Sequence, residues 1–268
     1  MKSINYKIEI YGLKKKFGDK VVFDGLDLKI IEGETFVLIG QSGVGKSVLL
    51  KHITGLIFPD EGEIYIDGEE IHSVSENRHL EIQNEIGMLF QGGALFDSFT
   101  VGQNLLFALD HMRPELDDKE KEIRILTSLE MVDLAGIEDV MPSELSGGMM
   151  KRVALARAIV SEPALVLFDE PTTGLDPIMT ANINELIASV KKNLKTTFIV
   201  VTHDISSARC VADRIGMLYN GKMIFTGSKR DLDKSDNAYL QQFIDGSTHG
   251  PILTEYKDAI KKMKEKLR

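Results

Sequence analysis

The stretch GQSGVGKS, residues 40–47, decides the fold of this 268-residue chain. It follows a short apolar run, TFVLIG (35–40), which is typical of a buried strand, and it opens a segment with a helical pattern, KSVLLKHITGL (46–56). Glycines let the backbone N–H groups of such a turn point inward around an anion, and the helix adds its N-terminal dipole. The pattern GxxxxGKS between a strand and a helix therefore predicts a phosphate-binding loop, or P-loop.

We expect the P-loop to bind a nucleotide through its turn and through two side chains. Lys46 supplies a point charge to the β- and γ-phosphates, and the hydroxyl of Ser47 is offered to Mg²⁺. The turn residues that complete this phosphate site are Gly40, Gln41, Ser42, Gly43, Val44 and Gly45. A P-loop alone does not separate a kinase from a GTPase or a motor, so the second half of the chain has to decide.

Two further apolar runs in the second half end in residues that carry chemistry. ALVLFDEP (164–171) ends in two adjacent carboxylates, and TFIVVTHD (197–204) delivers His203. Because strand carboxyl ends of a parallel α/β sheet converge on the ligand crevice, Asp169 is expected near the Mg²⁺ beside Ser47. Glu170, one residue on, is expected to point the other way and to polarise a water molecule against the γ-phosphate.

The order of the remaining patterns predicts an α/β fold. Early runs that alternate at period two, KIEIYGL (7–13) and VFDGLDLKI (22–30), are typical of strands. From about residue 92 to residue 160 the strand patterns stop and helical patterns replace them, which indicates an inserted helical subdomain. Strands then return, and Asn220-Gly221 between alternating apolar residues predicts a hairpin. From Ser247 the pattern weakens.

Composition and charge exclude some classes of protein. The net charge of −9 argues against nucleic acid as a partner, since nucleic-acid-binding domains usually carry a basic excess. No apolar run approaches the length of a membrane span, and the start of the chain lacks the apolar stretch of a signal peptide. The single cysteine, Cys210, excludes an intramolecular disulfide and fits a reducing cytosol.

With these motifs in order, the sequence resembles the ATPase subunit of an ATP-binding cassette (ABC) transporter. The resemblance covers about residues 6–245, and it depends on GQSGVGKS, LFQGG, ELSGGMM, ALVLFDEP, TGLDP and VTHD. It implies a RecA-like P-loop NTPase core sheet, N-terminal antiparallel strands, an inserted helical subdomain at 92–160 and a separate tail at 246–268. It also implies that ATP is the nucleotide and that water is the acceptor.

The resemblance assigns further roles to single residues. Phe17 would stack on adenine, although a place in the core is the alternative for this aromatic residue. Gln91 would approach Mg²⁺ and the attacking water, and it would link the catalytic core to the helical subdomain. His203 would contact the γ-phosphate, and Asp176 would lie in a loop that contacts a second subunit.

A second glycine turn, LSGGM (145–149), is the signature loop of this family. In the family, two subunits sandwich two ATP molecules, each held by the P-loop of one subunit and the signature loop of the other. The resemblance therefore implies a homodimer in which Ser146, Gly147 and Gly148 contact the γ-phosphate bound to the partner. Met149 departs from the usual glutamine, but the glycine N–H groups and the helix dipole survive this change.

Within the family, four stretches resemble the ATPases of MCE-type (mammalian cell entry) lipid transport systems: FQGGALFDSFTV, LSGGMMKRVALARA, DEPTTGLDPI and FIDGSTHGPI. This resemblance implies a phospholipid or other lipid as cargo, an integral membrane permease, an MCE-type substrate-binding protein, and a place on the cytoplasmic face of the inner membrane. The alternatives are the ATPase of a different importer or exporter, and a soluble ABC ATPase without a transporter.

Two segments are candidates for contacts with partners. Ala94, Leu95, Phe96 and Phe99 are apolar in a stretch expected at the surface, where they would receive the permease or, alternatively, fill the helical subdomain. The tail carries six Lys/Arg and three acids over residues 254–268, with an apolar stripe at Tyr256, Ile260, Met263 and Leu267. We expect it to dock on the partner ATPase, with a solvated end or a membrane-surface helix as alternatives.

Overall fold

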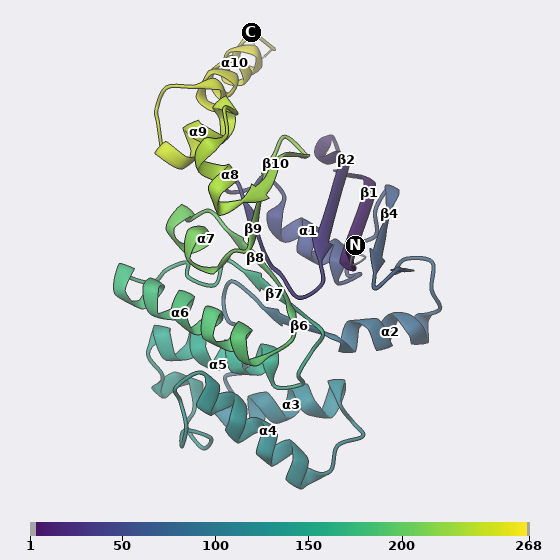
Figure 1. Cartoon of the computed structure of the whole chain (residues 1–268), viewed down its shortest axis with the longest axis vertical. Helices are drawn as coiled ribbons and strands as arrows, with labels where there is room; N and C mark the ends of the chain where they lie inside the picture. The colour runs from purple at the N-terminus through teal and green to yellow at the C-terminus, as the bar shows by residue number, and fades with distance from the viewer. Residues whose placement is uncertain (1–3, 267–268) are drawn as a thin grey trace.

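The described part of the chain consists of two β-sheets and the helices around them (Figure 1). The computed structural model describes residues 4–266, except for the side chains of residues 259, 260 and 262–266. The strands are β1 (Tyr6–Phe17), β2 (Lys20–Ile31), β3 (Thr35–Ile39), β4 (Glu61–Ile66), β5 (Glu69–Glu70), β6 (Ile86–Leu89), β7 (Leu165–Asp169), β8 (Thr197–Thr202), β9 (Arg214–Tyr219) and β10 (Lys222–Ser228). The helices are α1 (Lys46–Ile53), α2 (Glu76–Asn84), α3 (Val101–Met112), α4 (Asp118–Met131), α5 (Gly147–Ile159), α6 (Pro177–Asn193), α7 (Ile205–Val211), α8 (Lys229–Lys234), α9 (Ala238–Asp245) and α10 (Pro251–Lys266), with a 3-10 turn at Pro142–Glu144.

The larger sheet has the strand order β10-β9-β3-β8-β7-β6 and is parallel from β9 to β6. Its edge strand β10 runs antiparallel to β9. Asn220 and Gly221, which join them, have φ angles of 45° and 73°, and two successive positive φ angles are what a tight hairpin turn requires. The predicted hairpin is thus confirmed.

Four adjacent strands of this sheet end at the same edge. The P-loop follows β3, His203 follows β8, Glu170 follows β7, and Gln91 lies two residues after β6. Since β3, β8, β7 and β6 are neighbours in that order, four segments far apart in the sequence meet at one sheet edge.

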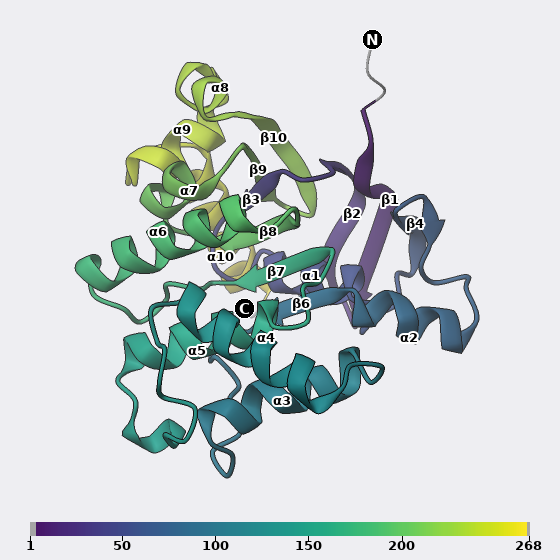
Figure 2. The ribbon, with the colours of Figure 1, turned by 60° about the horizontal axis from the view of Figure 1, so that its bottom comes forward.

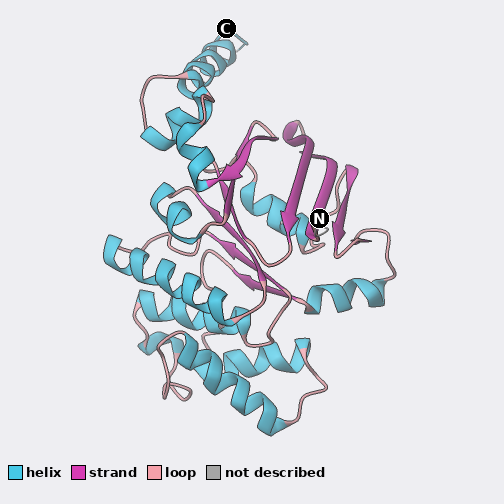
Figure 3. Ribbon diagram, in the orientation of Figure 1, coloured by secondary structure: helices cyan, strands magenta, loops and turns pink. Residues whose placement is uncertain are grey.

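The smaller sheet, with strand order β2-β1-β4-β5, is antiparallel and lies beside the larger one (Figure 3). Strand β3 is buried on both faces, because Phe36 and Leu38 pack with α1 and the smaller sheet while Val37 and Ile39 pack toward the helices. The predicted α/β fold with N-terminal antiparallel strands is confirmed.

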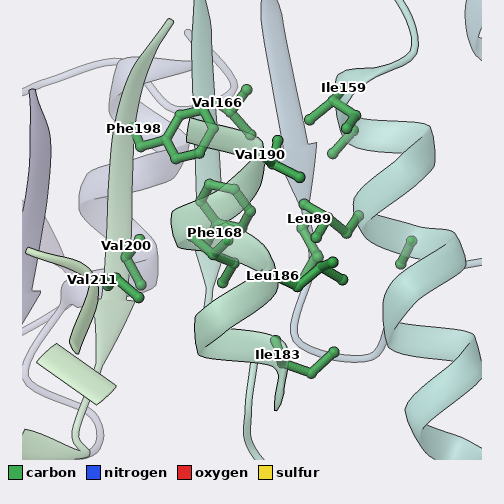
Figure 4. Packing of buried hydrophobic residues seen from close by; sticks show 14 of the residues in the cluster. Leu89, Ile159, Val166, Phe168, Ile183, Leu186, Val190, Phe198, Val200 and Val211 are labelled. Carbon is green, nitrogen blue, oxygen red and sulfur yellow. The ribbon is translucent and has the colours of Figure 1, made fainter. Parts of the chain in front are cut away.

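Helices α3, α4 and α5 gather beyond the β6 edge of the larger sheet (Figure 2), within the stretch 92–160 that was predicted to be helical. The core between the sheet and the helices is made of closely packed aliphatic and aromatic side chains (Figure 4). At its centre the rings of Phe168 and Phe198 meet edge to face at 5.1 Å. Each such buried ring contributes about 2–3 kcal/mol to folding.

The tail forms helix α10, which begins at Pro251, three residues before the stretch 254–268 that carries the predicted apolar stripe. Ile252 is buried and its N–H donates to Gln242 Oε1 at 2.8 Å, so this first turn is fixed to α9. Tyr256 is 62% exposed. The side chains of the other stripe residues, Ile260, Met263 and Leu267, lie outside the described residues. Among residues 4–266, no helix is long and apolar enough to cross a membrane.

Candidate nucleotide-binding site

A cleft of about 380 Å³ opens at the sheet edge where β3, β8, β7 and β6 end. Eight of its lining residues were expected from the sequence: Phe17, Ser42, Gly43, Gly45, Lys46, Ser47, Gln91 and Glu170. Lys20, Val22 and Val48 also line it and were missed. Lys20 and Val22 could have been predicted from the sequence, because the β1–β2 hairpin that places Phe17 at the cleft also brings these two residues to the same side.

The P-loop has a backbone that only glycine can adopt at two positions. Gly40 has a φ of 155°, and a Cβ atom there would lie 2.6 Å from the carbonyl oxygen of Leu218. Gly45 has a φ of 114°, and a Cβ atom would lie 2.7 Å from a methyl group of Val22. Gly40 and Gly45 are therefore required by close approach to neighbouring strands as well as by the turn.

The start of helix α1 is free to bind an anion. Gly45 at its N-cap offers no capping side chain, and no acidic residue lies in its first turn. Lys46 Nζ donates to the carbonyl oxygens of Gly40 at 2.8 Å and Gln41 at 3.1 Å. Burial lowers the pKa of Lys46, and a bound anion would raise it again by stabilising the charged ammonium group. The turn therefore combines free N–H groups, a helix dipole and a buried ammonium group.

Ser47 and Asp169 form an oxygen pair suited to a magnesium ion. Ser47 Oγ donates to Asp169 Oδ1 at 2.7 Å, which places the two side chains together as the strand order predicted. Burial raises the pKa of Asp169, because its negative charge is partly removed from water. A bound cation would stabilise that charge. No cluster of three or more His, Cys, Asp or Glu side chains suited to a metal is found in the described part of the chain. Mg²⁺ would therefore complete its coordination with nucleotide oxygens and water, as this ion commonly does.

Glu170 lies in the cleft, one residue beyond the end of the strand that carries Asp169. Strand β7 ends at Asp169, and Glu170 takes a left-handed φ of 51°, so the alternation of a strand no longer applies. Its Oε1 lies 3.4 Å from Lys46 Nζ, and its Oε2 lies 2.8 Å from Nδ1 of His203. Thr173 also donates to this carboxylate at 3.2 Å. Glu170 is thus held inside the cleft in a position from which a carboxylate can accept a proton.

Phe17 and Gln91, the residues expected to contact adenine and the attacking water, both line the cleft. Phe17 is 47% exposed, so its place is not in the core. Gln91 is also exposed, and the side chain of His203 is 51% exposed. A flat exposed ring at the rim of a phosphate site is suited to stacking against a base.

The signature loop does not line the cleft of its own chain. Ser146 caps helix α5 by accepting the N–H of Met149 at 3.3 Å, and both Ser146 and Gly147 are exposed. Gly148 is buried, and a Cβ atom there would lie 2.2 Å from the terminal methyl group of Met179. The start of α5 at Ser146 and Gly147 is therefore accessible to a group outside this chain.

Asp176 caps helix α6 through the N–H groups of Ile178 and Met179, at 2.9 and 3.0 Å. Ile178, which follows it, is 81% exposed, which is unusual for a large aliphatic side chain and was not expected from the sequence. An exposed isoleucine beside the loop assigned to subunit contact fits a surface that a second subunit would cover.

Comparison with known proteins agrees with this geometry. The family model described as "ABC transporter" matches residues 23–173, more than half of the chain. The intermembrane phospholipid transport system ATP-binding protein of Haemophilus influenzae is 39% identical over 260 residues, covering 96% of this chain and 98% of the relative. The probable ribonucleotide transport ATP-binding protein of Mycobacterium leprae is 42% identical over 254 residues, covering 94% and 72%.

Solved structures show the same architecture. The cbiO1 protein of Clostridium perfringens, part of an ABC transporter complex, superposes with a TM-score of 0.79 at 28% identity and covers 90% of this chain and 95% of that one. A dimeric bacterial ABC transporter cassette gives a TM-score of 0.74 at 32% identity, covering 82% and 98%. This chain therefore belongs to the ABC transporter family, as an ATP-binding ATPase.

Proposed function

We propose that this chain is the ATP-hydrolysing subunit of an envelope transporter that moves lipids, in the first place phospholipids. The observation that carries the proposal is the near end-to-end match to the Haemophilus influenzae phospholipid transport protein, at 39% identity over 96% of this chain and 98% of the relative. The stretches ALFDSF, SGGMM and DGSTHGPI, which resemble MCE-type ATPases, point the same way.

The working unit is a homodimer with two shared ATP sites. Each cleft binds the phosphates through the P-loop, while Ser146, Gly147 and Gly148 of the second subunit close over the γ-phosphate. Three features support this arrangement: Ser146 and Gly147 are exposed, the signature loop does not line the cleft of its own chain, and α5 begins at this exposed end. Phe17 stacks on the adenine base at the rim.

Hydrolysis uses residues that the cleft already orders. Glu170 takes a proton from the attacking water as the oxygen of that water bonds to the γ-phosphorus, while the bond from the γ-phosphorus to the β–γ bridging oxygen breaks and ADP leaves. His203 and Lys46 hold the carboxylate in place. Ser47, Asp169 and Gln91 would hold Mg²⁺, which when bound neutralises charge on the β- and γ-phosphates. Lys46 exchanges the P-loop carbonyl oxygens for phosphate oxygens when the nucleotide enters.

The permease docks on an aromatic patch made of Phe96, Phe99 and Phe107. Their ring centroids lie 4.8 to 6.1 Å apart, and Phe96 and Phe107 remain 42% and 38% exposed. Exposed aromatic clusters of this kind mark contact surfaces. Attached through this patch, the dimer sits on the cytoplasmic face of the inner membrane, with an MCE-type substrate-binding protein as a further component.

Reconstitution tests the proposal. The chain is co-purified with its permease and MCE protein, placed in liposomes, and assayed for ATP-dependent transfer of a fluorescent phospholipid, with a Lys46→Ala complex as the matched control. Transfer that requires ATP and is lost in the control supports the proposal. Because the mycobacterial relatives are named for ribonucleotide transport, ribonucleotide uptake is measured in parallel. Uptake without phospholipid transfer would refute the lipid assignment.

A further inference from the structure

The loop that carries Gln91 has a constrained backbone. This segment, residues 90–100, is called the Gln91 loop here, and it joins β6 to α3. Gly93 and Ala94 are both left-handed, with φ angles of 78° and 51°, and the second is unfavourable for a residue with a Cβ atom. Such a conformation persists only where the surroundings fix it, so the contacts of this loop identify what holds it.

Two cations of helix α5 hold the first half of the Gln91 loop. Arg157 donates through Nη2 to the carbonyl oxygen of Gly93 at 2.9 Å and through Nη1 to that of Ala94 at 2.7 Å. Lys151 donates through Nζ to the carbonyl oxygen of Gln91 itself. Gly93 is buried against α5, since a Cβ atom there would lie 3.7 Å from the Cβ of Ala154.

These cations are not held by carboxylates. Within residues 4–266 as described, neither Lys151 nor Arg157 has an acidic side chain within 4 Å. Burial lowers the pKa of both groups, so their placement against carbonyl oxygens costs desolvation free energy. A fork of two N–H groups on two successive carbonyl oxygens fixes orientation as well as distance, and this geometry is specific to arginine.

Helix α3 holds the second half of the loop. Asn104 is fully buried, and its Oδ1 accepts the N–H of Phe96 at 2.8 Å. Its Nδ2 faces the carbonyl oxygens of Phe96, Phe99 and Thr100 at 3.0 to 3.2 Å. Each half of the loop is thus hydrogen-bonded to a helix, the first to α5 and the second to α3.

We propose that Arg157 and Lys151 are positioning residues that tie the Gln91 loop to the signature helix α5. The inference rests on the proposed function. It makes helix α5 and the Gln91 loop one rigid unit. A nucleotide bound at the N-terminus of α5 would then shift the backbone of Gln91, and a permease bound at Phe96 would shift it too. Gln91 reaches its working position in the cleft only while the fork of Arg157 holds the loop.

Hydrogen exchange tests the tie itself, without reference to activity. In the intact complex, Arg157→Met should raise the exchange rate of a peptide spanning residues 91–96 at least fivefold. Arg124→Met is the matched control, because Arg124 also donates to a backbone carbonyl, that of Ser161 at 3.2 Å, and does not touch the loop. Equal exchange in the 91–96 peptide of wild type and Arg157→Met would overturn the proposal.

Kinetics test the consequence. Arg157→Met should lower kcat for ATP in the transporter complex about 10- to 100-fold, because a displacement of about 1 Å is that costly, with KM unchanged. In a Gln91→Ala background the same change should cost less than about twofold, since the residue it positions is gone. An equal loss in both backgrounds would show a general structural role and would overturn the proposal.

Arg157→Lys covers the case in which Arg157→Met does not fold. Lysine keeps the charge but cannot donate to both carbonyl oxygens in the geometry of the arginine fork. The kcat of Arg157→Lys should therefore lie between those of wild type and Arg157→Met, and hydrogen exchange in the 91–96 peptide should be faster than in wild type. Wild-type values for both kcat and exchange would overturn the proposal. Normal kcat in Gln91→Ala alone would instead refute the role given to Gln91 in the proposed function and the kinetic consequence with it. The exchange experiment would still decide whether the tie exists.

Discussion

Changing Gly147 to alanine should make the protein more stable and less active. Gly147 is the first residue of α5, its φ is not positive, and apart from its chain neighbours and the backbone of its own helix no described atom lies within 4 Å of where a Cβ would stand. Nothing inside the chain therefore requires glycine here. Alanine in a first helical turn is favoured over glycine by up to about 1 kcal/mol. For a domain of this size, that gain raises the thermal midpoint by about 2–4 °C.

The loss of activity follows from what approaches the loop from outside. If a γ-phosphate bound to the second subunit meets the N–H groups of Gly147 and Gly148, a methyl group at residue 147 stands in its path. Loss of one such donor to a developing charge typically lowers kcat by about 10²- to 10³-fold. ATP binding to the isolated subunit should not change, because the P-loop is untouched.

Two measurements check this prediction: the thermal midpoint of the purified subunit, and ATP turnover by the complex with its permease. Gly102→Ala is the contrasting variant, since Gly102 also lies in a first helical turn but a Cβ there would stand 3.1 Å from the carbonyl oxygen of Glu138. Gly102→Ala should therefore not raise the midpoint. Normal turnover by Gly147→Ala would refute a phosphate contact at this glycine, and a lowered midpoint would show an internal need for it.

Four further predictions concern other parts of the molecule. Glu170→Gln should lower kcat by about 10²- to 10⁴-fold while equilibrium ATP binding persists, and near-normal turnover would mean that another group activates the water. Mixing Lys46→Ala with Ser146→Arg subunits should restore part of the ATPase activity, since the mixed dimer contains one intact shared site. The Ser146→Arg homodimer should be inactive, and wild-type hydrolysis by it would exclude a phosphate contact at this loop. Phe96→Asp should preserve ATP affinity but abolish co-purification with the permease, and normal transport by this variant would contradict docking at the aromatic patch. Burial lowers the pKa of His52, whose Nε2 has no hydrogen-bond partner among the described residues. The unfolded chain therefore binds a proton before the folded one as pH falls, and stability should be lost below about pH 6.5, by up to about 1.4 kcal/mol per pH unit. Chemical denaturation at pH 7.5 and 5.5 should show a weaker pH dependence for His52→Leu, and equal dependence would exclude His52 as its source.

The parts of the site that could be predicted are those fixed by short sequence spacing and by strand order. GQSGVGKS is a local pattern, and the strand ALVLFD places Asp169 beside Ser47 because neighbouring parallel strands end at one edge. The direction expected for Glu170 rested on the alternation of side chains along a strand, and that rule holds only within a strand. A left-handed residue directly after β7 breaks that rule, and the sequence carries no glycine or asparagine to announce it.

The contacts of the Gln91 loop could not be predicted, for a different reason. Arg157 lies 64 and 63 residues from Gly93 and Ala94, and it binds their backbone carbonyl oxygens. Every residue has a backbone carbonyl oxygen, so the identity of a side chain does not show which carbonyl accepts a hydrogen bond. No pairing of oppositely charged residues in the sequence therefore points to these contacts. The short helices α7, α8 and α9 were also missed, since six to eight residues span only about two turns and show no clear period.

Helix α5 explains why methionine is acceptable at residue 149 of the signature loop. The Ser146 hydroxyl caps the helix by accepting the N–H of Met149, and the Met149 side chain packs against the core. Replacing glutamine there leaves the N–H groups of Gly147 and Gly148 where a phosphate would meet them. What Met149 adds is anchorage: a helix of 13 residues, about 20 Å long, is fixed to the core near the end that would meet the nucleotide. Motion at that end would then reach Lys151 and Arg157 as a shift of the whole helix, because the helix is held by packing at Met149 as well as by its own hydrogen bonds.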